Sequence, residues 1–341
     1  MSKLRAVVIG IGSVGSSLHK IMLEKGVEIV AAVDLDPSKK GKDLADVIGI
    51  EEKTNILISD NLEETLKVVD AEIAVVSVAT FEISHPIYKK CVEAGLNVIN
   101  TDDQCTFPFN LYPELSDELD ALARKYGVTV TASGNQDALG VHLPVLISGC
   151  CSEISTITAL VRTDLNNAGA QTCRDFHAGS TLGSFHSSIG EKYEFRPFRH
   201  YAESIASALG MTTIDVDFTD EPLTDTVPVF CKPLDMTIEP GLVTGKNTIT
   251  EVFTDGGIII RAEYAVKVFA EGELPKRVWK IEGNPDMNVD YTALGVPPIS
   301  RATQLVNRIP DVINMTPGLI SIDQYSPLRY RARPLHEYIA Q

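Results

Sequence analysis

The sequence predicts an α/β protein with a doubly wound parallel sheet, followed by a second α+β domain with an open, mostly antiparallel sheet. A glycine-rich loop joins an apolar strand to an amphipathic helix near residue 10. Apolar strands and helices then alternate as far as residue 133, which is typical of a parallel sheet with helices on both faces. Later segments alternate polar and apolar residues with period two, which favours antiparallel strands. We therefore expect domains at 1–133 and 134–305, with residues 306–341 returning to the first domain as helices and a tail.

The chain is acidic, with 30 Lys and Arg against 46 Asp and Glu and a net charge of -16. Nucleic acids and anionic membrane surfaces both require clustered positive charge, so we expect neither as a partner. The longest apolar runs are also shorter than the roughly 18 residues that a membrane-spanning helix needs.

The chain start and the cysteines bear on the compartment and on metal binding. The opening "MSKLRAVVIG" runs directly into a strand and lacks the pattern of a signal peptide. The six cysteines are scattered and without Cys-x-x-Cys spacing, so we expect reduced thiols in the cytoplasm. Neither His-Glu-x-x-His nor a paired Cys/His set occurs, so no metal site is expected.

A dinucleotide-binding unit of the Rossmann type is predicted at residues 4–37. Gly10 permits a tight turn, Gly12 lets the backbone approach a pyrophosphate, and Gly15 allows the helix to pack closely on the strand. The N-terminus of that helix offers free N–H groups to the phosphates. The expected cofactor-binding loop comprises Gly10, Ile11, Gly12, Ser13, Val14 and Gly15.

Asp34, at the end of the second strand, bears on the choice between NAD and NADP. A carboxylate at this place binds the ribose diol of NAD and repels the additional phosphate of NADP. Ser38, Lys39 and Lys40 follow closely and could receive that phosphate. We therefore expect NAD or NADP as cofactor, with NAD slightly favoured.

Two later strand ends are expected at the ligand-binding edge of the same sheet, because ligands of open α/β sheets bind beyond the carboxyl ends of the strands. The strand at 71–80 ends in Val78, Ala79 and Thr80, which we expect beside the nicotinamide ribose. The next strand is followed by "TDDQC", whose first residue, Thr101, we also expect near the cofactor. Asp102, Asp103 and Gln104 then become candidates for proton transfer and substrate binding.

The second domain begins with a helix that we expect to be mostly buried and to carry Asn135, Gln136 and Asp137 at its polar start. Residues 166–199 are rich in Gly, Ser, His and Phe and are expected to form a loop over the cleft. His142, His177 and His186 are each more often structural than catalytic in such settings.

The C-terminal segment is expected to form a helix up to Pro310, a second short helix and a turn at Pro317 and Gly318. A basic tail follows, which we interpret as a surface or subunit contact; its arginines are Arg329, Arg331 and Arg333.

Three segments resemble the natural amine dehydrogenases and 2,4-diaminopentanoate dehydrogenases, whose Rossmann domain is dihydrodipicolinate-reductase-like. They are "AAVDLDPSKKGKDLADVIGI", "LISGCCSEISTI" and "NRIPDVINMTPGL". The resemblance implies NAD(P)H-dependent reductive amination of a ketone with ammonia, or the reverse deamination of an amine. It also implies a homodimer built through the open sheet and a small amine or ketone as substrate.

The same resemblance implies a catalytic glutamate in a short acidic pair before a proline, and this glutamate is replaced here. The matching positions hold Asp103 and Gln104 before Pro108. Aspartate can act as the acid/base, whereas glutamine cannot transfer a proton in this way. We therefore expect Asp103 to be the acid/base, with Asp102, Gln104 and Asn135 hydrogen-bonding the substrate.

A second departure from the family lies at Asn135-Gln136-Asp137, where diaminopentanoate dehydrogenases tend to carry Asn-Pro-Gly. Diaminopentanoate itself is therefore not the expected substrate. Asp137 could orient an amine or replace the missing base. A carbonyl or cyclic imine reductase and a non-catalytic nucleotide-binding homologue remain the alternatives.

Overall fold

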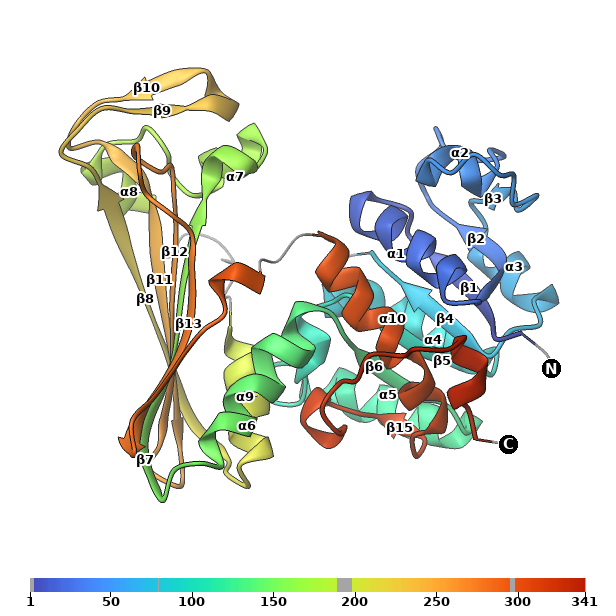
Figure 1. Ribbon diagram of the computed structural model, residues 1–341. Coiled ribbons are helices and arrows are strands. Elements are labelled where there is room, and N and C mark those ends of the chain that lie inside the picture. The colour runs from blue at the N-terminus through green and yellow to red at the C-terminus, as the bar shows by residue number, and fades with distance from the viewer. Residues whose placement is uncertain (1–2, 79, 189–197, 295–297, 341) are drawn as a thin grey trace. The chain divides into compact units, whose positions relative to one another are not determined.

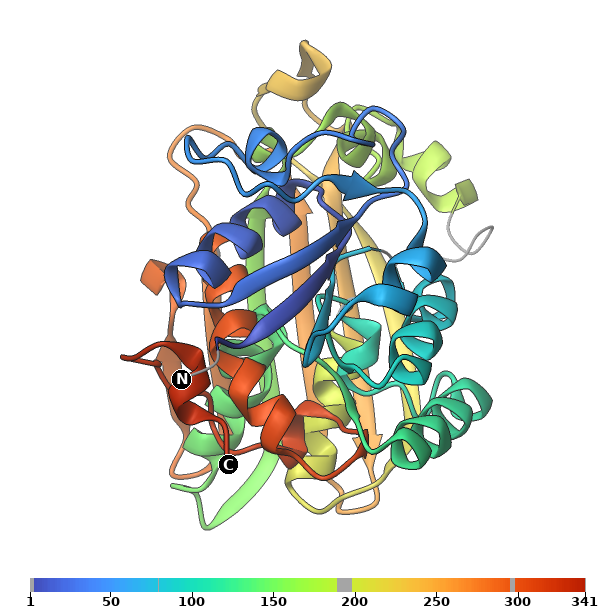
Figure 2. The same ribbon diagram turned by 90° about the vertical axis from the view of Figure 1, so that its right-hand side faces the viewer.

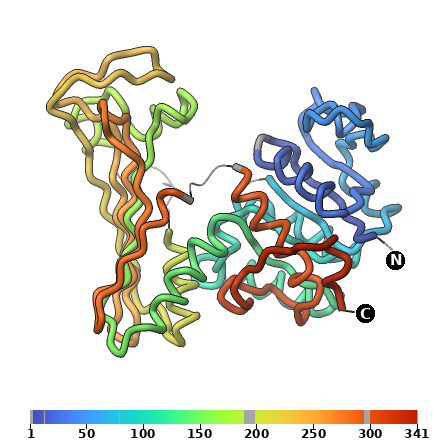
Figure 3. The backbone as a smooth tube through the Cα atoms, viewed as in Figure 1, coloured from blue at the N-terminus to red at the C-terminus, as the bar shows by residue number. Residues whose placement is uncertain are grey.

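The computed structural model describes residues 3–78, 80–188, 198–294 and 298–340. The chain divides into two compact units, Met1–Leu143 with Val296–Gln341, and Pro144–Gly295. Figures 1 and 3 show the C-terminal segment, in red, lying within the first unit. The first unit therefore extends beyond residue 133, where the sequence placed the boundary, and it includes residues 298–305.

The first unit contains a fully parallel seven-stranded sheet with the strand order β15-β6-β5-β4-β1-β2-β3 (Figure 2). Its strands are β1 (Arg5–Ile9), β2 (Glu28–Val33), β3 (Ile58–Ser59), β4 (Ile73–Val76), β5 (Asn97–Asn100), β6 (Thr129–Ala132) and β15 (Gly318–Leu319). The doubly wound α/β fold expected from the sequence is confirmed. The edge strand beside β6 is β15. The sequence analysis had instead expected the strand at residues 128–133 to close the sheet on this side.

Helices cover both faces of this sheet, as the alternation along β1 requires. Ala6 and Val8 pack into one apolar core with α1 and α10, while Val7 and Ile9 pack into another with α4 and α5. The helices are α1 (Ser13–Glu24), α2 (Leu44–Ile48), α3 (Leu62–Val68), α4 (Phe81–Glu93), α5 (Pro113–Tyr126) and α10 (Pro298–Asn314), with a π-helix over Gln136–His142. Successive strand residues point to opposite faces, so each strand contributes to both cores.

Helix α10 corrects one expectation, because it continues through Pro310 as a single helix of 17 residues. A proline inside a helix removes one backbone hydrogen bond and normally favours a break. Leu305, Val306, Ile309 and Val312 of α10 are all fully buried in the core beside α1. Packing of this apolar face therefore outweighs the local preference that predicted two helices.

The second unit contains a six-stranded mixed sheet in the order β14-β13-β7-β12-β11-β8. All neighbours are antiparallel except β12 and β7, which confirms the mostly antiparallel sheet. Its strands are β7 (Glu153–Asp164), β8 (Thr213–Thr224), β11 (Val243–Thr254), β12 (Ile259–Lys267), β13 (Lys276–Asn284) and β14 (Met287–Asp290). A separate pair, β9 (Val229–Cys231) and β10 (Met236–Ile238), forms a small antiparallel sheet.

Helices in the second unit occupy part of the segment expected to be a loop. They are α7 (Ala170–Asp175) and α8 (Leu182–Ser188), while α9 (Arg199–Ala208) begins at the last residue of that segment. Helix α6 (Leu143–Ser148) connects from the first unit. Residues 189–197 of that segment lie outside the described residues. Within the described ranges, every helix is too short or too polar to cross a lipid bilayer.

Candidate functional site

The glycine loop after β1 has the backbone geometry that a dinucleotide requires. Gly10 has a φ of 86°, and a Cβ there would lie 2.2 Å from the carbonyl oxygen of Ser77. A Cβ on Gly15 would lie 2.5 Å from the carbonyl oxygen of Gly10, so strand and helix are in direct contact. A Cβ on Gly12 would meet no atom within 4 Å. The space above Gly12 is therefore open for a phosphate to approach the backbone.

The N-terminus of α1 is free to bind an anion. Gly12 provides no side-chain cap, and the first turn carries no acidic residue. The first N–H groups of a helix lack intrahelical partners, and the helix dipole favours negative charge there. Together with the open space at Gly12, this fits the pyrophosphate of NAD or NADP.

Asp34 is held in place at the end of β2 by three donors. The N–H of Ile11 donates to Oδ2 (2.7 Å), the N–H of Asp36 to Oδ1 (2.9 Å) and the ammonium of Lys39 to Oδ2 (2.9 Å). Burial alone would raise the pKa of Asp34, but the N–H of Asp36, Lys39 and the N–H of Ile11 together lower it. Asp34 is therefore an ionised acceptor beside a fixed positive charge.

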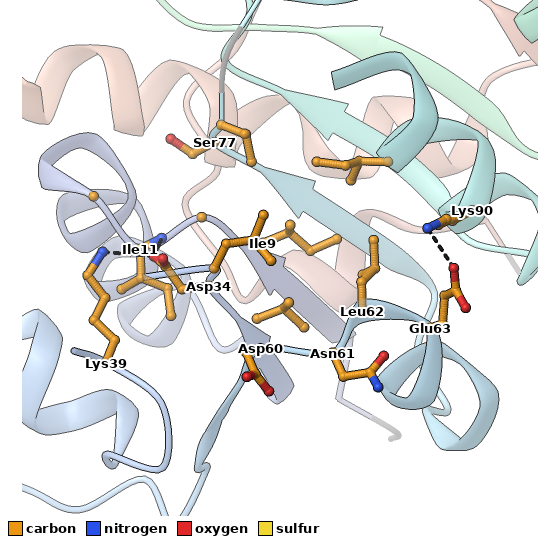
Figure 4. Close-up of a pocket in the computed structure, with 16 residues that line it drawn as sticks. Ile9, Ile11, Asp34, Lys39, Asp60, Asn61, Leu62, Glu63, Ser77 and Lys90 are labelled. Atoms are coloured by element: carbon orange, nitrogen blue, oxygen red, sulfur yellow. Dashed lines mark hydrogen bonds and ion pairs between the residues drawn. The ribbon is translucent and has the colours of Figure 1, made fainter. Parts of the chain in front are cut away.

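A cavity of about 500 Å³ lies over this loop and joins the predicted cofactor residues. Figure 4 shows Asp34 and Lys39 on one side and the Lys90–Glu63 ion pair on the other. Gly10, Ile11, Gly12, Asp34 and Val78 all line this cavity, and the sequence analysis named each of them as an expected cofactor contact. Its volume is within the usual range for small-molecule sites.

Part of the cavity wall was missed by the sequence analysis. Asp60, Asn61, Leu62 and Glu63 line the cavity and follow β3, a strand of two residues. The signal was present in "NILIS", an apolar run that leads into Asp60, but such a short run does not distinguish a strand from a loop.

The residues expected near the nicotinamide lie at the ends of β4 and β5. The hydroxyl of Thr101 donates to the hydroxyl of Ser77 (3.4 Å), which links these two strand ends. Thr80 precedes α4 and does not cap it with its side chain. Ala79 lies outside the described residues, and nothing is described of the side chain of Ser13.

The segment "TDDQC" follows β5 and contains carboxyl groups in different environments. Asp102 is 7% exposed, and its Oδ1 accepts the N–H of Gln104 (2.9 Å). Asp103 is half-buried at the start of a 3₁₀ turn at Gln104–Thr106. Of this pair, Asp103 is the more exposed residue.

Gln104 has a structural contact that the sequence did not indicate. Its Oε1 accepts the N–H of Phe81 (3.1 Å) in the first turn of α4 and the hydroxyl of Tyr112 (3.3 Å). An unpaired N–H at a helix start normally needs such an acceptor. The carbonyl end of Gln104 therefore holds α4 in place, in contrast to the substrate contact expected for it.

Asp137 also differs from expectation, because its carboxylate is committed to a buried ion pair. Arg308 of α10 donates from Nε to Oδ2 (2.8 Å) and from Nη2 to Oδ1 (2.7 Å), and Ser133 donates its hydroxyl to Oδ2 (2.8 Å). The side chain of Asp137 is fully buried and that of Arg308 is 2% exposed. This geometry assigns Asp137 to holding the π-helix against α10. It does not provide a second base.

The remaining candidates lie in separate settings. Asn135 directly precedes the π-helix, and its buried Oδ1 has no hydrogen-bond partner among the described residues. Nε2 of His142 lies 3.4 Å from both Nη2 of Arg308 and Oδ1 of Asp137, and burial lowers the pKa of His142.

His177 and His186 belong to the second unit, where both rings pack against Phe185. Among the residues that the structure describes, no three His, Cys, Asp or Glu side chains gather as a metal site.

Two known protein families match consecutive parts of the chain. Residues 4–132 match the N-terminal domain of dihydrodipicolinate reductase. Residues 141–329, more than half of the chain, match the C-terminal domain of 2,4-diaminopentanoate dehydrogenase. The resemblance drawn from the sequence is thereby confirmed.

Individual relatives cover nearly the whole chain. The 2,4-diaminopentanoate dehydrogenase of Acetoanaerobium sticklandii is 24% identical over 333 residues, which are 94% of this chain and 92% of that protein. The solved amine dehydrogenase from Mycobacterium smegmatis is 30% identical, with a TM-score of 0.85 and coverage of 97% and 98% of the two chains. A probable dehydrogenase from Thermotoga maritima, 13% identical with a TM-score of 0.61 over 94% and 92% of the chains, is similar in fold.

Proposed function

The chain belongs to the 2,4-diaminopentanoate dehydrogenase family, and we propose that it catalyses NAD(P)-dependent reductive amination of a small ketone, or the reverse oxidative deamination of an amine. The cavity over the glycine loop, the open space at Gly12 and the uncapped start of α1 support the cofactor. When bound, the reduced nicotinamide supplies the hydride, and the protein supplies orientation and proton transfer.

Asp103 acts as the acid/base in this proposal. The observation that carries it is the position of Asp103, which is half-buried and lies just beyond the carboxyl end of β5, where ligands of such sheets bind. Two other carboxyls named by the sequence have their own settings, because Asp102 is enclosed and Asp137 is paired with Arg308.

In this proposal, Asp103 carries out both proton transfers of the reaction. Asp103 takes a proton from ammonium, so that ammonia can add to the ketone carbon. The same carboxyl then returns the proton to the hydroxyl of the adduct, which leaves as water and gives the iminium for reduction. Ketone, ammonium and reduced cofactor thus yield amine, water and oxidised cofactor, with Asp103 ionised before and after.

The test is the initial rate of NADH and NADPH oxidation with a panel of small ketones and aldehydes, with and without concentrated ammonium. We expect oxidation that depends on ammonium. Oxidation of equal rate without ammonium would instead identify a carbonyl reductase. Tight cofactor binding without turnover of any panel member, in both directions, would contradict the proposed activity.

Lys39 allows the site to use NADP as well as NAD. Its ammonium compensates the charge of Asp34 at 2.9 Å, and both residues line the same cavity. The ribose diol of NAD can donate to Asp34, whereas the 2′-phosphate of NADP needs a nearby cation. With Lys39 in place, the repulsion between Asp34 and that phosphate is reduced.

Lys39→Met is expected to weaken NADPH binding by about 10-fold to 100-fold, the size of one lost hydrogen bond to a charged group. NADH binding should change by less than about 3-fold on the same scale. Dissociation constants from cofactor fluorescence titration check both values. Lys53→Met is the matched control, because Lys53 pairs with Asp46, its side chain is 57% exposed, and neither residue lines the cavity. An equal loss for both cofactors would show that Lys39 does not select between them.

We further propose a cytoplasmic homodimer. The six cysteines are free thiols and Cys150 is exposed, which fits a reducing compartment. Strand β8 forms an edge of the second sheet and exposes Ile214 (67%), and an exposed edge strand with apolar side chains can pair with a second chain. Light scattering of the purified chain measures the oligomeric state.

A further inference from the structure

Asp102 is an enclosed carboxyl next to the proposed acid/base. It follows β5, and its own N–H donates to Oδ1 of Asn100 (3.0 Å). Its Oδ1 accepts the N–H of Gln104, whereas its Oδ2 is buried and has no hydrogen-bond partner among the described residues. These contacts fix the side chain at the end of the strand. The hydroxyl of Tyr88 also hydrogen-bonds this carboxyl, so its donors are neutral groups.

The groups around Asp102 are neutral or negative. The titratable neighbours are Tyr88 from α4, Cys105 from the 3₁₀ turn and Asp103 beside it in the chain. Among the described residues, no Lys, Arg or His forms an ion pair with Asp102. A buried carboxylate without a cation is costly, and such a group normally takes up a proton.

The direction of the pKa shift of Asp102 agrees with this geometry. Burial raises the pKa of Asp102 to about 7, the N–H of Gln104 opposes the rise, and the charge of Asp103 adds to it. The negative charge of the neighbouring Asp103 therefore acts in the same direction as burial and disfavours the ionised form of Asp102.

We propose that Asp102 holds a proton beside ionised Asp103, and that release of this proton makes Asp103 a stronger base. Asp102 is then a positioning residue that acts through Asp103 and does not contact the substrate, in contrast to the hydrogen bond expected from the sequence. This inference rests on the proposed function of Asp103. No covalent bond forms, and the proton passes between Asp102 and water.

The consequence for activity has a definite sign. Above neutral pH, Asp102 becomes negative, and its charge disfavours the ionised form of Asp103, which makes Asp103 a stronger base. A base whose pKa is nearer the working pH transfers protons more efficiently. Turnover should therefore gain a component that rises through about pH 7, the value to which Asp102 is shifted.

The kinetic test compares wild type with Asp102→Asn, since asparagine resembles the protonated acid. The ratio of their kcat/KM values cancels the titration of ammonium and of the substrate. We expect this ratio to be near one at pH 5.5 and to rise about 10-fold by pH 9, with a midpoint near 7. Asp117→Asn, the same chemical change at an exposed position of α5, should give a flat ratio. A flat ratio for Asp102→Asn as well would overturn the inference.

A spectroscopic test does not depend on activity. Infrared difference spectra between pH 6 and pH 9 should contain the C=O band of one buried protonated carboxyl, absent from Asp102→Asn. If this band is present but no substrate is turned over, the proposed function fails while the protonation of Asp102 stands. Should Asp102→Asn not fold, Tyr88→Phe serves instead, because Tyr88 lowers the pKa of Asp102 and its loss should move the midpoint to higher pH. Absence of the band in the wild type would disprove the protonated state.

Discussion

We expect Asp103→Asn to lower kcat for ammonium-dependent turnover by about 100-fold or more, while NADH still binds. Asparagine preserves the size and shape of the side chain but cannot take a proton from ammonium or return it to the leaving hydroxyl. Asp103 is not among the residues that line the cofactor cavity, so the dissociation constant of NADH should change little. Steady-state kinetics and NADH fluorescence titration on the same preparation measure the two effects separately.

Asp103→Glu is the matched control for this prediction. It restores the type of carboxyl that the family resemblance implies and should retain measurable turnover, because proton transfer remains available. Full activity in Asp103→Asn would remove Asp103 from the mechanism. Loss of both turnover and NADH binding would indicate a structural role for Asp103.

Arg308→Met is expected to destabilise the first unit by about 3–5 kcal/mol, the typical cost of removing one partner from a buried ion pair. The guanidinium contacts Asp137 through two nitrogens and also donates to the carbonyl of Ser326 (3.0 Å) and to Asp311 (3.1 Å). Its loss leaves the fully buried carboxylate of Asp137 without a cation. Methionine fills part of the volume, so the effect measures mainly the uncompensated charge.

Urea unfolding followed by far-ultraviolet circular dichroism checks this value. Tryptophan fluorescence is unsuitable, because the single tryptophan, Trp279, lies in the second unit. Arg333→Met is the control: Arg333 is 75% exposed and pairs with Glu337, and such surface pairs contribute about 0–1 kcal/mol. Equal losses in the two variants would contradict the role of the buried pair. The double variant Arg308→Met with Asp137→Leu should recover part of the loss, since it removes the unpaired charge.

The sequence by itself determined the cofactor half of the protein. The glycine loop, the start of α1 and Asp34 lie within one continuous segment, and turn geometry, helix start and strand end all depend on neighbouring residues. Period-two alternation likewise identified the second sheet, because side-chain direction in a strand is a local property. Such features can be predicted from spacing and residue type.

Only the tertiary structure decided the state of the polar residues at the substrate end. Asp137 meets Arg308 across 171 positions of sequence, and Gln104 reaches Phe81 across 23. Helix α10 continues through Pro310 because a distant core holds its apolar face. Burial and pairing arise from contacts between remote segments, and these decide whether a carboxyl is ionised, neutral or committed to a cation. Residue type could therefore name Asp102, Asp103 and Asp137 as candidates, while their different roles depend on what the fold brings next to each of them.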